Sequence, residues 1–205
     1  MRANQQELFG GKNAREMISV LFAARNSIYK TIPGLDVWDE DRDALKWPGG
    51  NPGIFHPPCR LFSQIAYLAK SAPQEEKQLG YWSVDAVRKN GGVLEQPANS
   101  SLWRECEIAM PGSSDGDGFS ISVPQFWFGH KARKNTWLYI CGMRLKDLPS
   151  IPFKLGEATH TVGGGLSESR KRNVVYKPSL WSTERSATPV AFAHWLVESA
   201  ERAQK

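Results

Sequence analysis

Short apolar runs separated by turn-forming or charged residues fill the first half of the chain. They stand at residues 17–22, 35–38, 53–55 and 93–95, and a stretch with apolar side chains at helical spacing, 74–90, precedes the last of them. Apolar runs this short, bounded in this way, are typical of buried strands. Short strands that alternate with helices predict βαβ units and a mostly parallel sheet.

The pattern changes after Trp103, where glycine, serine and basic residues become frequent. Residues 120–128 and 136–141 predict two strands that form an antiparallel pair around a basic turn. We therefore predict one Rossmann-like α/β domain over residues 1–205, with a mostly parallel sheet and a C-terminal antiparallel extension. Further expected elements are a helix at 61–70, a final helix at 189–203, and two loops, 111–135 and 156–188, that face the substrate.

The overall charge of the chain limits the class of partner. Its 205 residues carry a net charge of +5, and basic residues gather at 130–134 and 169–172, which favours nucleic acid before a membrane. Three cysteines are an odd and sparse set, which argues against a disulfide framework and for a reducing compartment. Residues 1–7 lack the apolar run of a signal peptide, and no stretch reaches the about 20 apolar residues of a membrane span. We expect a cytoplasmic protein.

The expected strands place four polar segments at one edge of the sheet. They are the turn at 23–26, the acidic cluster at 39–41, the loop at 56–59, and Glu95 with the two residues after it. In open α/β sheets, ligands bind beyond the carboxyl ends of the strands. These segments are therefore the candidate site.

A cysteine stands directly after two prolines in the third of these segments. The sequence reads Pro57-Pro58-Cys59-Arg60-Leu61-Phe62-Ser63. Consecutive prolines lack N–H groups and fix a stiff, extended turn, so the thiol is expected to point from the end of the sheet into the crevice above it.

This P-P-C-x-x-F-S string resembles the catalytic loop of the cytosine-5 DNA methyltransferases, and the four segments resemble four parts of that family in the same order. The stretches 128–136 and 185–189 resemble a phage-type version of the family. The resemblance implies a class I methyltransferase fold, DNA as partner, S-adenosylmethionine as cofactor, Cys59 as nucleophile and Glu95 as the acid at the base edge. The residues that it implies for the cofactor are Phe22, Ala23, Arg25, Asn26, Asp39, Asp41 and Pro57, with Asp39 or Asp41 at the ribose.

The chemistry of cytosine explains why these residue types belong together. C5 becomes nucleophilic once a thiolate has added to C6, and a carboxyl group at the base edge stabilises the developing charge. We expect His56 and Arg60 to favour the thiolate of Cys59, and apolar surroundings to raise the pKa of Glu95 so that it donates a proton. The residues expected to contact nucleic acid are Arg60, Ser63, Lys131, Arg133, Lys134, Arg170 and Arg172.

Two features leave other functions open. The turn at 22–27 has no glycine, and Arg25 puts a cation where the family holds a sulfonium, so this loop binds methionine differently or takes an anionic ligand. The same fold could then modify a base or nucleotide with another donor, or act without catalysis as a DNA-binding or anti-restriction phage protein. His56-x-x-Cys59 has zinc-ligand spacing, but no second close pair exists and we expect no metal.

Overall fold

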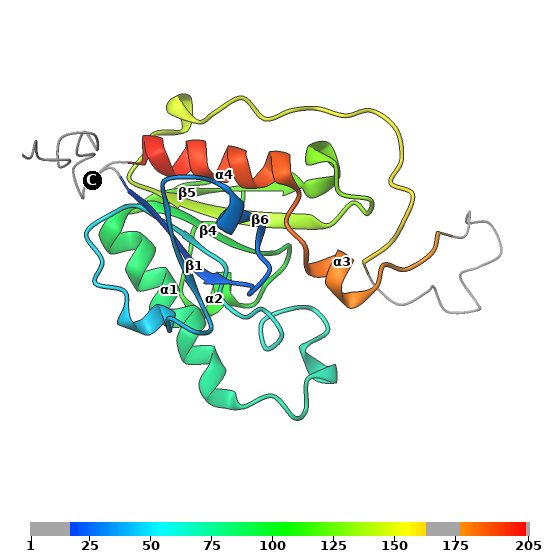
Figure 1. Cartoon of the computed structure of the whole chain (residues 1–205), viewed down its shortest axis with the longest axis horizontal. Helices are drawn as coiled ribbons and strands as arrows, with labels where there is room; N and C mark the ends of the chain where they lie inside the picture. Colours follow the sequence, from blue (N-terminus) through cyan, green and yellow to red (C-terminus); the bar gives the residue numbers. More distant parts are fainter. Residues whose placement is uncertain (1–16, 163–176, 204–205) are drawn as a thin grey trace, which may run out of the picture.

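The computed structural model describes residues 17–162 and 177–203 and has an α/β architecture around one mixed sheet (Figure 1). Six strands lie in the order β2-β1-β3-β4-β6-β5. Strands β1 to β4 run parallel, and β6 pairs antiparallel with both β4 and β5. The strand bounds are β1 Ile18–Ala23, β2 Leu35–Asp39, β3 Gly53–Phe55, β4 Gly92–Pro97, β5 Gly118–Pro124 and β6 Asn135–Cys141. The predicted α/β class, with its parallel first part and antiparallel extension, is confirmed.

One long helix covers each face of the sheet (Figure 1). Helix α4, Val190–Arg202, packs on the face that carries Val20, Ile54 and Val93. Helix α1, Lys77–Asn90, packs on the face that carries the next residue of each strand, Leu21, Phe55 and Leu94. Successive side chains of a strand point to opposite faces, so short runs that are apolar throughout supply both cores.

A glycine pair makes the close approach between β3 and β4 possible. Gly91 ends α1 with a φ of 83°, and Gly92 begins β4 with a φ of 113°. A Cβ at Gly92 would lie 1.9 Å from the carbonyl oxygen of Gly53. Only glycine fits there, because an L side chain disfavours positive φ and the strand backbones leave no room. The two strands that lead into the candidate site are thereby held in register.

The remaining helical elements are short. They are η2 Ile28–Thr31, η3 Ala44–Lys46, η4 Ala66–Leu68, η5 Gln74–Glu76, α2 Leu102–Glu105, η6 Gln125–Phe128, η7 Leu145–Asp147 and α3 Ser182–Ser186. Of these, η2 and η6 supply side chains to the site described below.

The predicted helix at residues 61–70 is wrong. The segment forms turns and the three-residue η4. The carbonyl of Phe62, which a helix would use for the N–H of Ala66, instead accepts a hydrogen bond from the N–H of Ser101 at 2.8 Å, while the Ala66 N–H bonds to the Ser63 carbonyl. Phe62 is 1% exposed, and burying its ring against α1 fixes this irregular path.

The predicted strand at 120–128 ends at Pro124. Proline has no N–H for the ladder, and the next four residues form η6, which ends at Gly129 with a left-handed φ of 98°. In the described part of 156–188, α3 and two isolated β-bridges interrupt the expected loop. Across the described residues, no helix has both the length and the apolar character needed to cross a membrane.

Candidate functional site

The carboxyl ends of the four parallel strands meet at one edge of the sheet, as predicted. His56 follows β3 directly, and Glu95 lies in β4 one residue beyond the β3 pairing partner Leu94. The Cys59 loop and Glu95 therefore come from adjacent strands. The turn after β1 and the acidic cluster after β2 lie farther along the same edge.

Hydrogen bonds to the sheet and within the loop hold the Cys59 segment. Gln96, 1% exposed, donates from Nε2 to the carbonyl of Pro57 at 2.7 Å. The carbonyl of Cys59 accepts the N–H groups of Phe62 at 3.0 Å and Ser63 at 2.8 Å. The path of the loop is thus fixed on both sides of the half-buried thiol.

Glu95 lies at the centre of a group of polar side chains from four elements. Its Oε2 lies 3.1 Å from Nδ1 of His56, and its Oε1 accepts a hydrogen bond from Nε2 of Gln125 at 3.2 Å. His56 Nε2 lies 3.0 Å from the hydroxyl of Tyr29, and Gln125 Nε2 also donates to Oγ1 of Thr136 at 3.0 Å. The carboxyl group is mostly buried, with a side-chain exposure of 16%.

The expected raised pKa of Glu95 is corrected by these contacts. Burial does raise the pKa, but the hydrogen bond from His56 and the charge of Lys134 are among the effects that outweigh it, and the pKa lies below its ordinary value. Glu95 is therefore a carboxylate at neutral pH and accepts hydrogen bonds, rather than an acid that donates a proton.

The expectation for Cys59 is also wrong. Burial and then the charge of Glu95 raise the pKa of the thiol above its ordinary value, and Lys134 offsets them in part. His56 is turned toward Glu95, and the guanidinium of Arg60 forms an ion pair with Glu76. Neither of the two sequence neighbours supports the thiolate, because each has an acidic partner of its own.

Lys134 is the cation that acts on both groups. It stands at a left-handed φ of 39°, and its Nζ donates to the carbonyl of Ala187 at 3.1 Å. Burial lowers the pKa of Lys134, and the charges of Glu95 and Cys59 act in the opposite direction. The ammonium therefore compensates the carboxylate and favours ionisation of the thiol.

The other predicted nucleic-acid contacts are distributed over the surface. Lys131 forms an ion pair with Glu184 at 2.6 Å, which ties the basic turn to α3. Arg133 is exposed next to it, and Ser63 is half-buried in the Cys59 loop. Arg170 and Arg172 lie outside the described residues.

The predicted cofactor residues lie at the ends of β1 and β2, where charged groups pair with one another. The buried carboxylate of Asp39 accepts hydrogen bonds from Lys30 and from the N–H of Asp41. Arg25 pairs with Glu40 at 3.3 Å and with Asp41 at 3.0 Å. A ribose at Asp39 would share its carboxylate with the Lys30 ammonium and with backbone N–H groups, so this arrangement differs from the free ribose ligand that the resemblance implies.

The remaining cofactor positions surround the bulge at the end of β1. Phe22 has a left-handed φ of 61°, and its ring packs edge-on against Trp82 with centroids 5.9 Å apart. Ala23 is buried opposite Asp39, and Asn26 is exposed in the turn. The backbone thus bends as a glycine would allow, while an aromatic ring fills the space that a glycine would leave open.

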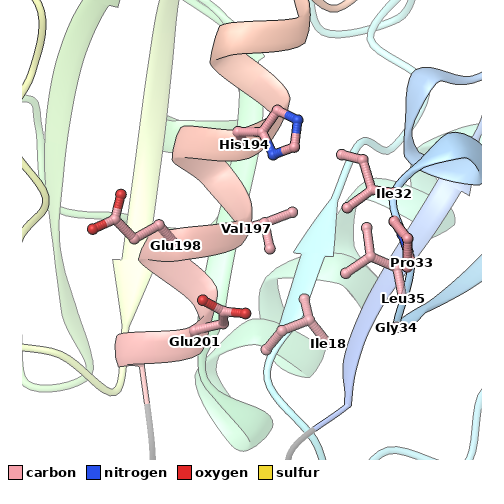
Figure 2. Close-up of a pocket in the computed structure, with 9 residues that line it drawn as sticks. All are labelled: Ile18, Ile32, Pro33, Gly34, Leu35, His194, Val197, Glu198 and Glu201. Atoms are coloured by element: carbon pink, nitrogen blue, oxygen red, sulfur yellow. The ribbon is translucent and has the colours of Figure 1, made fainter.

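Two cavities lie near β2, and neither contains Cys59 or Glu95. One of about 420 Å³ runs along β2 beside Asp39 and Asp41. The other, of about 360 Å³, lies between α4 and the segment 32–35, where His194, Glu198 and Glu201 line its polar side (Figure 2). Ile18 and Leu35 line the second cavity and begin β1 and β2, so it lies at the amino ends of the strands, away from the candidate site.

Tyr29, Gln125 and Thr136 are site residues that the sequence pattern does not single out. They come from η2, η6 and β6 and reach Glu95 through tertiary packing. Apolar or strand-like neighbours surround each of them in sequence, and that context favours a core role. Pro124, which ends β5 just before Gln125, is the one local signal near them.

Among the side chains of the described residues, no group of three or more histidines, cysteines and carboxylates could hold a metal ion. Cys141 lies buried in β6, and Cys106 follows α2.

Comparisons of the chain with protein-family models, curated proteins and solved structures give no match.

Proposed function

We propose that the protein is a DNA base-modifying enzyme in which the thiolate of Cys59 adds to C6 of a cytosine. The observation that carries this proposal is the position of three groups at one edge of the sheet: Cys59 follows β3, Glu95 lies near the end of the adjacent β4, and Lys134 precedes β6, whose start pairs with the end of β4. Their charges accordingly act on one another's pKa values. A thiol, a carboxylate and an ammonium grouped at such an edge are an arrangement typical of functional sites.

The sheet topology supports the same class of enzyme. Four parallel strands are followed by a pair in which β6 alone runs against the others, and this resembles the Rossmann-like sheet of class I methyltransferases. One fold hosts many activities, so the sheet topology alone does not set the chemistry. The proposal therefore depends on the residues at the edge.

The proposed step leaves atoms and charges balanced. The thiolate sulfur of Cys59 forms a bond to C6, the π electrons of the C5–C6 bond move to C5, and C5 takes a proton from solvent. Loss of the original C5 proton and departure of the thiolate restore the base, with its C5 hydrogen exchanged. Lys134 supports the thiolate, and Glu95 accepts a hydrogen bond from the 4-amino group of the cytosine.

The donor of any transferred group is a separate question. S-adenosylmethionine is the donor that the resemblance proposes, and the ion pairs of Arg25 and Lys30 at the ends of β1 and β2 oppose its binding. The exchange of the C5 hydrogen needs no donor. It therefore tests the nucleophile by itself.

The test measures tritium released to water from DNA that carries [5-³H]cytosine, in single-stranded and duplex form. We expect release with the wild-type protein, loss of release with Cys59→Ser, and wild-type release with the matched control Cys106→Ser. A parallel reaction with S-adenosylmethionine, followed by mass spectrometry of the nucleosides, detects 5-methylcytosine. Absence of release from both DNA forms and from deoxycytidine monophosphate, with folded wild-type protein, overturns the proposal.

A non-catalytic DNA-binding role is the second candidate, and the raised pKa of Cys59 favours it, because a protonated thiol is a poor nucleophile. In that case the Cys59→Ser variant binds labelled DNA as the wild type does, and neither protein releases tritium. Fluorescence anisotropy in the same buffer measures this binding.

A further inference from the structure

A chain of hydrogen bonds runs from the core to Glu95. The hydroxyl of Tyr29 lies 3.0 Å from Nε2 of His56, and Nδ1 of His56 lies 3.1 Å from Oε2 of Glu95. The rings of Tyr29 and His56 lie 5.4 Å apart at an angle of 36°. Tyr29 is 1% exposed, so the end of this series of hydrogen bonds that lies farthest from Glu95 is held in the apolar core beneath α4.

The direction of these hydrogen bonds follows from Tyr29. Burial, and then the charge of Glu95, raise the pKa of its phenol well above the ordinary value, so Tyr29 keeps its proton. Among the described residues, Nε2 of His56 is the hydrogen-bond partner of this buried hydroxyl, so the O–H is satisfied when it donates to Nε2. In that arrangement Nε2 accepts, and the imidazole proton lies on Nδ1. That N–H donates to Oε2 of Glu95.

Gln125 holds the other carboxylate oxygen. Its Nε2 donates to Oε1 of Glu95 at 3.2 Å and to Oγ1 of Thr136 at 3.0 Å. The opposite amide orientation would place two acceptors against each other, so the pairing sets the direction of the amide. Oε1 of the buried Gln125 has no hydrogen-bond partner among the described residues.

We propose that Tyr29, His56 and Gln125 are positioning residues that hold Glu95 as an ionised hydrogen-bond acceptor beside Cys59. Each oxygen of Glu95 has a neutral donor, and about two of its four lone-pair sites stay available for a ligand. The carboxylate of Glu95 therefore offers acceptors, so it suits a ligand group that carries N–H donors. The proposal rests on the proposed function, because it assigns these residues to the same site.

The arrangement differs from the role that the resemblance implies for Glu95. An acid at the base edge would donate a hydrogen bond or a proton, whereas a carboxylate held by His56 and Gln125 accepts a hydrogen bond. The titratable groups that face it are Tyr29, His56, Cys59 and Lys134, from η2, the loop after β3 and the basic turn. Lys134 compensates the negative charge of Glu95 through space, so the groups that bond directly to Glu95, the imidazole of His56 and the amide of Gln125, are neutral donors.

The first test does not depend on activity. Long-range ¹H–¹⁵N NMR spectra of the imidazoles identify which nitrogen of His56 carries the proton, with His56→Asn used for assignment. We expect the Nδ1–H tautomer in the wild type and a mixture of tautomers in Tyr29→Phe. The matched control is Tyr81→Phe, which removes a tyrosine hydroxyl outside the site, one that donates to Glu105 at 2.7 Å. An Nε2–H tautomer in the wild type, or a Tyr29→Phe spectrum identical to the wild type, overturns the proposal.

The second test uses tritium release. Gln125→Leu removes a hydrogen bond to the charged Glu95, and Tyr29→Phe removes the hydrogen bond that orients His56 toward Glu95. We expect each to lower the rate at saturating DNA by about tenfold, with the DNA concentration for half-maximal rate little changed. Unchanged rates in both variants overturn the positioning role and leave the nucleophile intact. Absence of release from the wild type overturns the proposed function instead. The tautomer of His56 then still shows whether Tyr29 and His56 hold Glu95 as proposed.

Discussion

At the ends of β1 and β2 the charged side chains pair with one another, whereas at the ends of β3 and β4 they lie apart. In the first region Arg25 contacts Glu40 and Asp41, and Lys30 contacts Asp39. In the second, Glu95 accepts hydrogen bonds from an imidazole and an amide, and the Lys134 ammonium bonds to backbone carbonyls. Both regions occupy the same edge of the sheet, so the difference comes from the side chains.

The difference separates a region whose charges neutralise one another directly from one whose charged groups are not paired with one another. Direct ion pairs satisfy both partners and leave little to gain from a further charged group. A carboxylate, a thiol and an ammonium that influence one another without direct contact keep unsatisfied capacity, which a folded protein retains where function requires it. Of the two regions, the ends of β3 and β4 are therefore the better place for chemistry.

The largest expected effect comes from removing the cation of the second region. Lys134→Met eliminates the charge that offsets Glu95 at the thiol, so the pKa of Cys59 rises further and less thiolate forms. We expect tritium release to fall by about 10², the loss typical for one group that stabilises charge at an active site. The measurement is the rate at saturating DNA over a range of pH.

Lys131→Met is the matched control for this prediction. Lys131 belongs to the same basic turn, but its partner is the exposed carboxylate of Glu184. Its loss is expected to weaken DNA binding at low salt and to leave the rate at saturating DNA unchanged. Equal losses of rate in both variants would show that the two lysines act only through the overall positive charge of the turn. Lys134 would then have no specific role at the Cys59 thiol, which contradicts the prediction.

An intermediate effect is expected from opening the ion pair of the first region. Hydrogen bonding by Lys30, partly opposed by burial, holds the pKa of Asp39 below its ordinary value of 3.8. A carboxylate of this kind stabilises the fold above that pH, and the stabilisation is lost as pH falls through the lowered pKa. Asp39→Asn should therefore lower the unfolding temperature at pH 7, and the difference from the wild type should shrink under strongly acidic conditions.

Thermal unfolding followed by circular dichroism from pH 7 to pH 3 measures this difference. Asp85→Asn is the control, because Asp85 is exposed on α1. A difference that stays constant over the whole range would assign the effect of Asp39→Asn to packing, and the charges of the first region would then contribute little to the fold.

Much of the sheet is readable from the sequence, because each short apolar run supplies both of its faces. The runs at 17–22, 35–38 and 53–55 became β1, β2 and β3 with bounds shifted by at most one residue. The helix expected at 61–70 failed for a nonlocal reason: Ser101, about 40 residues away, takes the carbonyl that a helix would need. Ile65, Tyr67 and Leu68 are exposed there, so apolar content alone did not indicate burial.

The candidate site was readable only in part, for a similar reason. Cys59 follows β3 and Glu95 lies near the carboxyl end of β4, and these adjacent strands bring them to one edge. Their pKa values depend on burial, on each other and on Lys134, which packing across the sheet sets and no local motif does. The sequence therefore predicted that Cys59 and Glu95 lie at the same edge of the sheet, but the predicted direction of the pKa shift was wrong for both groups.

The smallest expected effect concerns the donor. Arg25 is exposed, and an exposed ion pair is worth at most about 1 kcal/mol, so freeing the turn with Arg25→Gly should tighten binding of S-adenosylmethionine by no more than about fivefold. Calorimetric titration compares wild type, Arg25→Gly and the control Arg144→Gly, which removes an equally exposed pair with Asp147 far along the chain. Asp41→Ala weakens binding if Asp41 contacts the ribose. If none of these proteins binds S-adenosylmethionine while tritium release persists, the ends of β1 and β2 serve the fold, and the chemistry at Cys59 uses another donor.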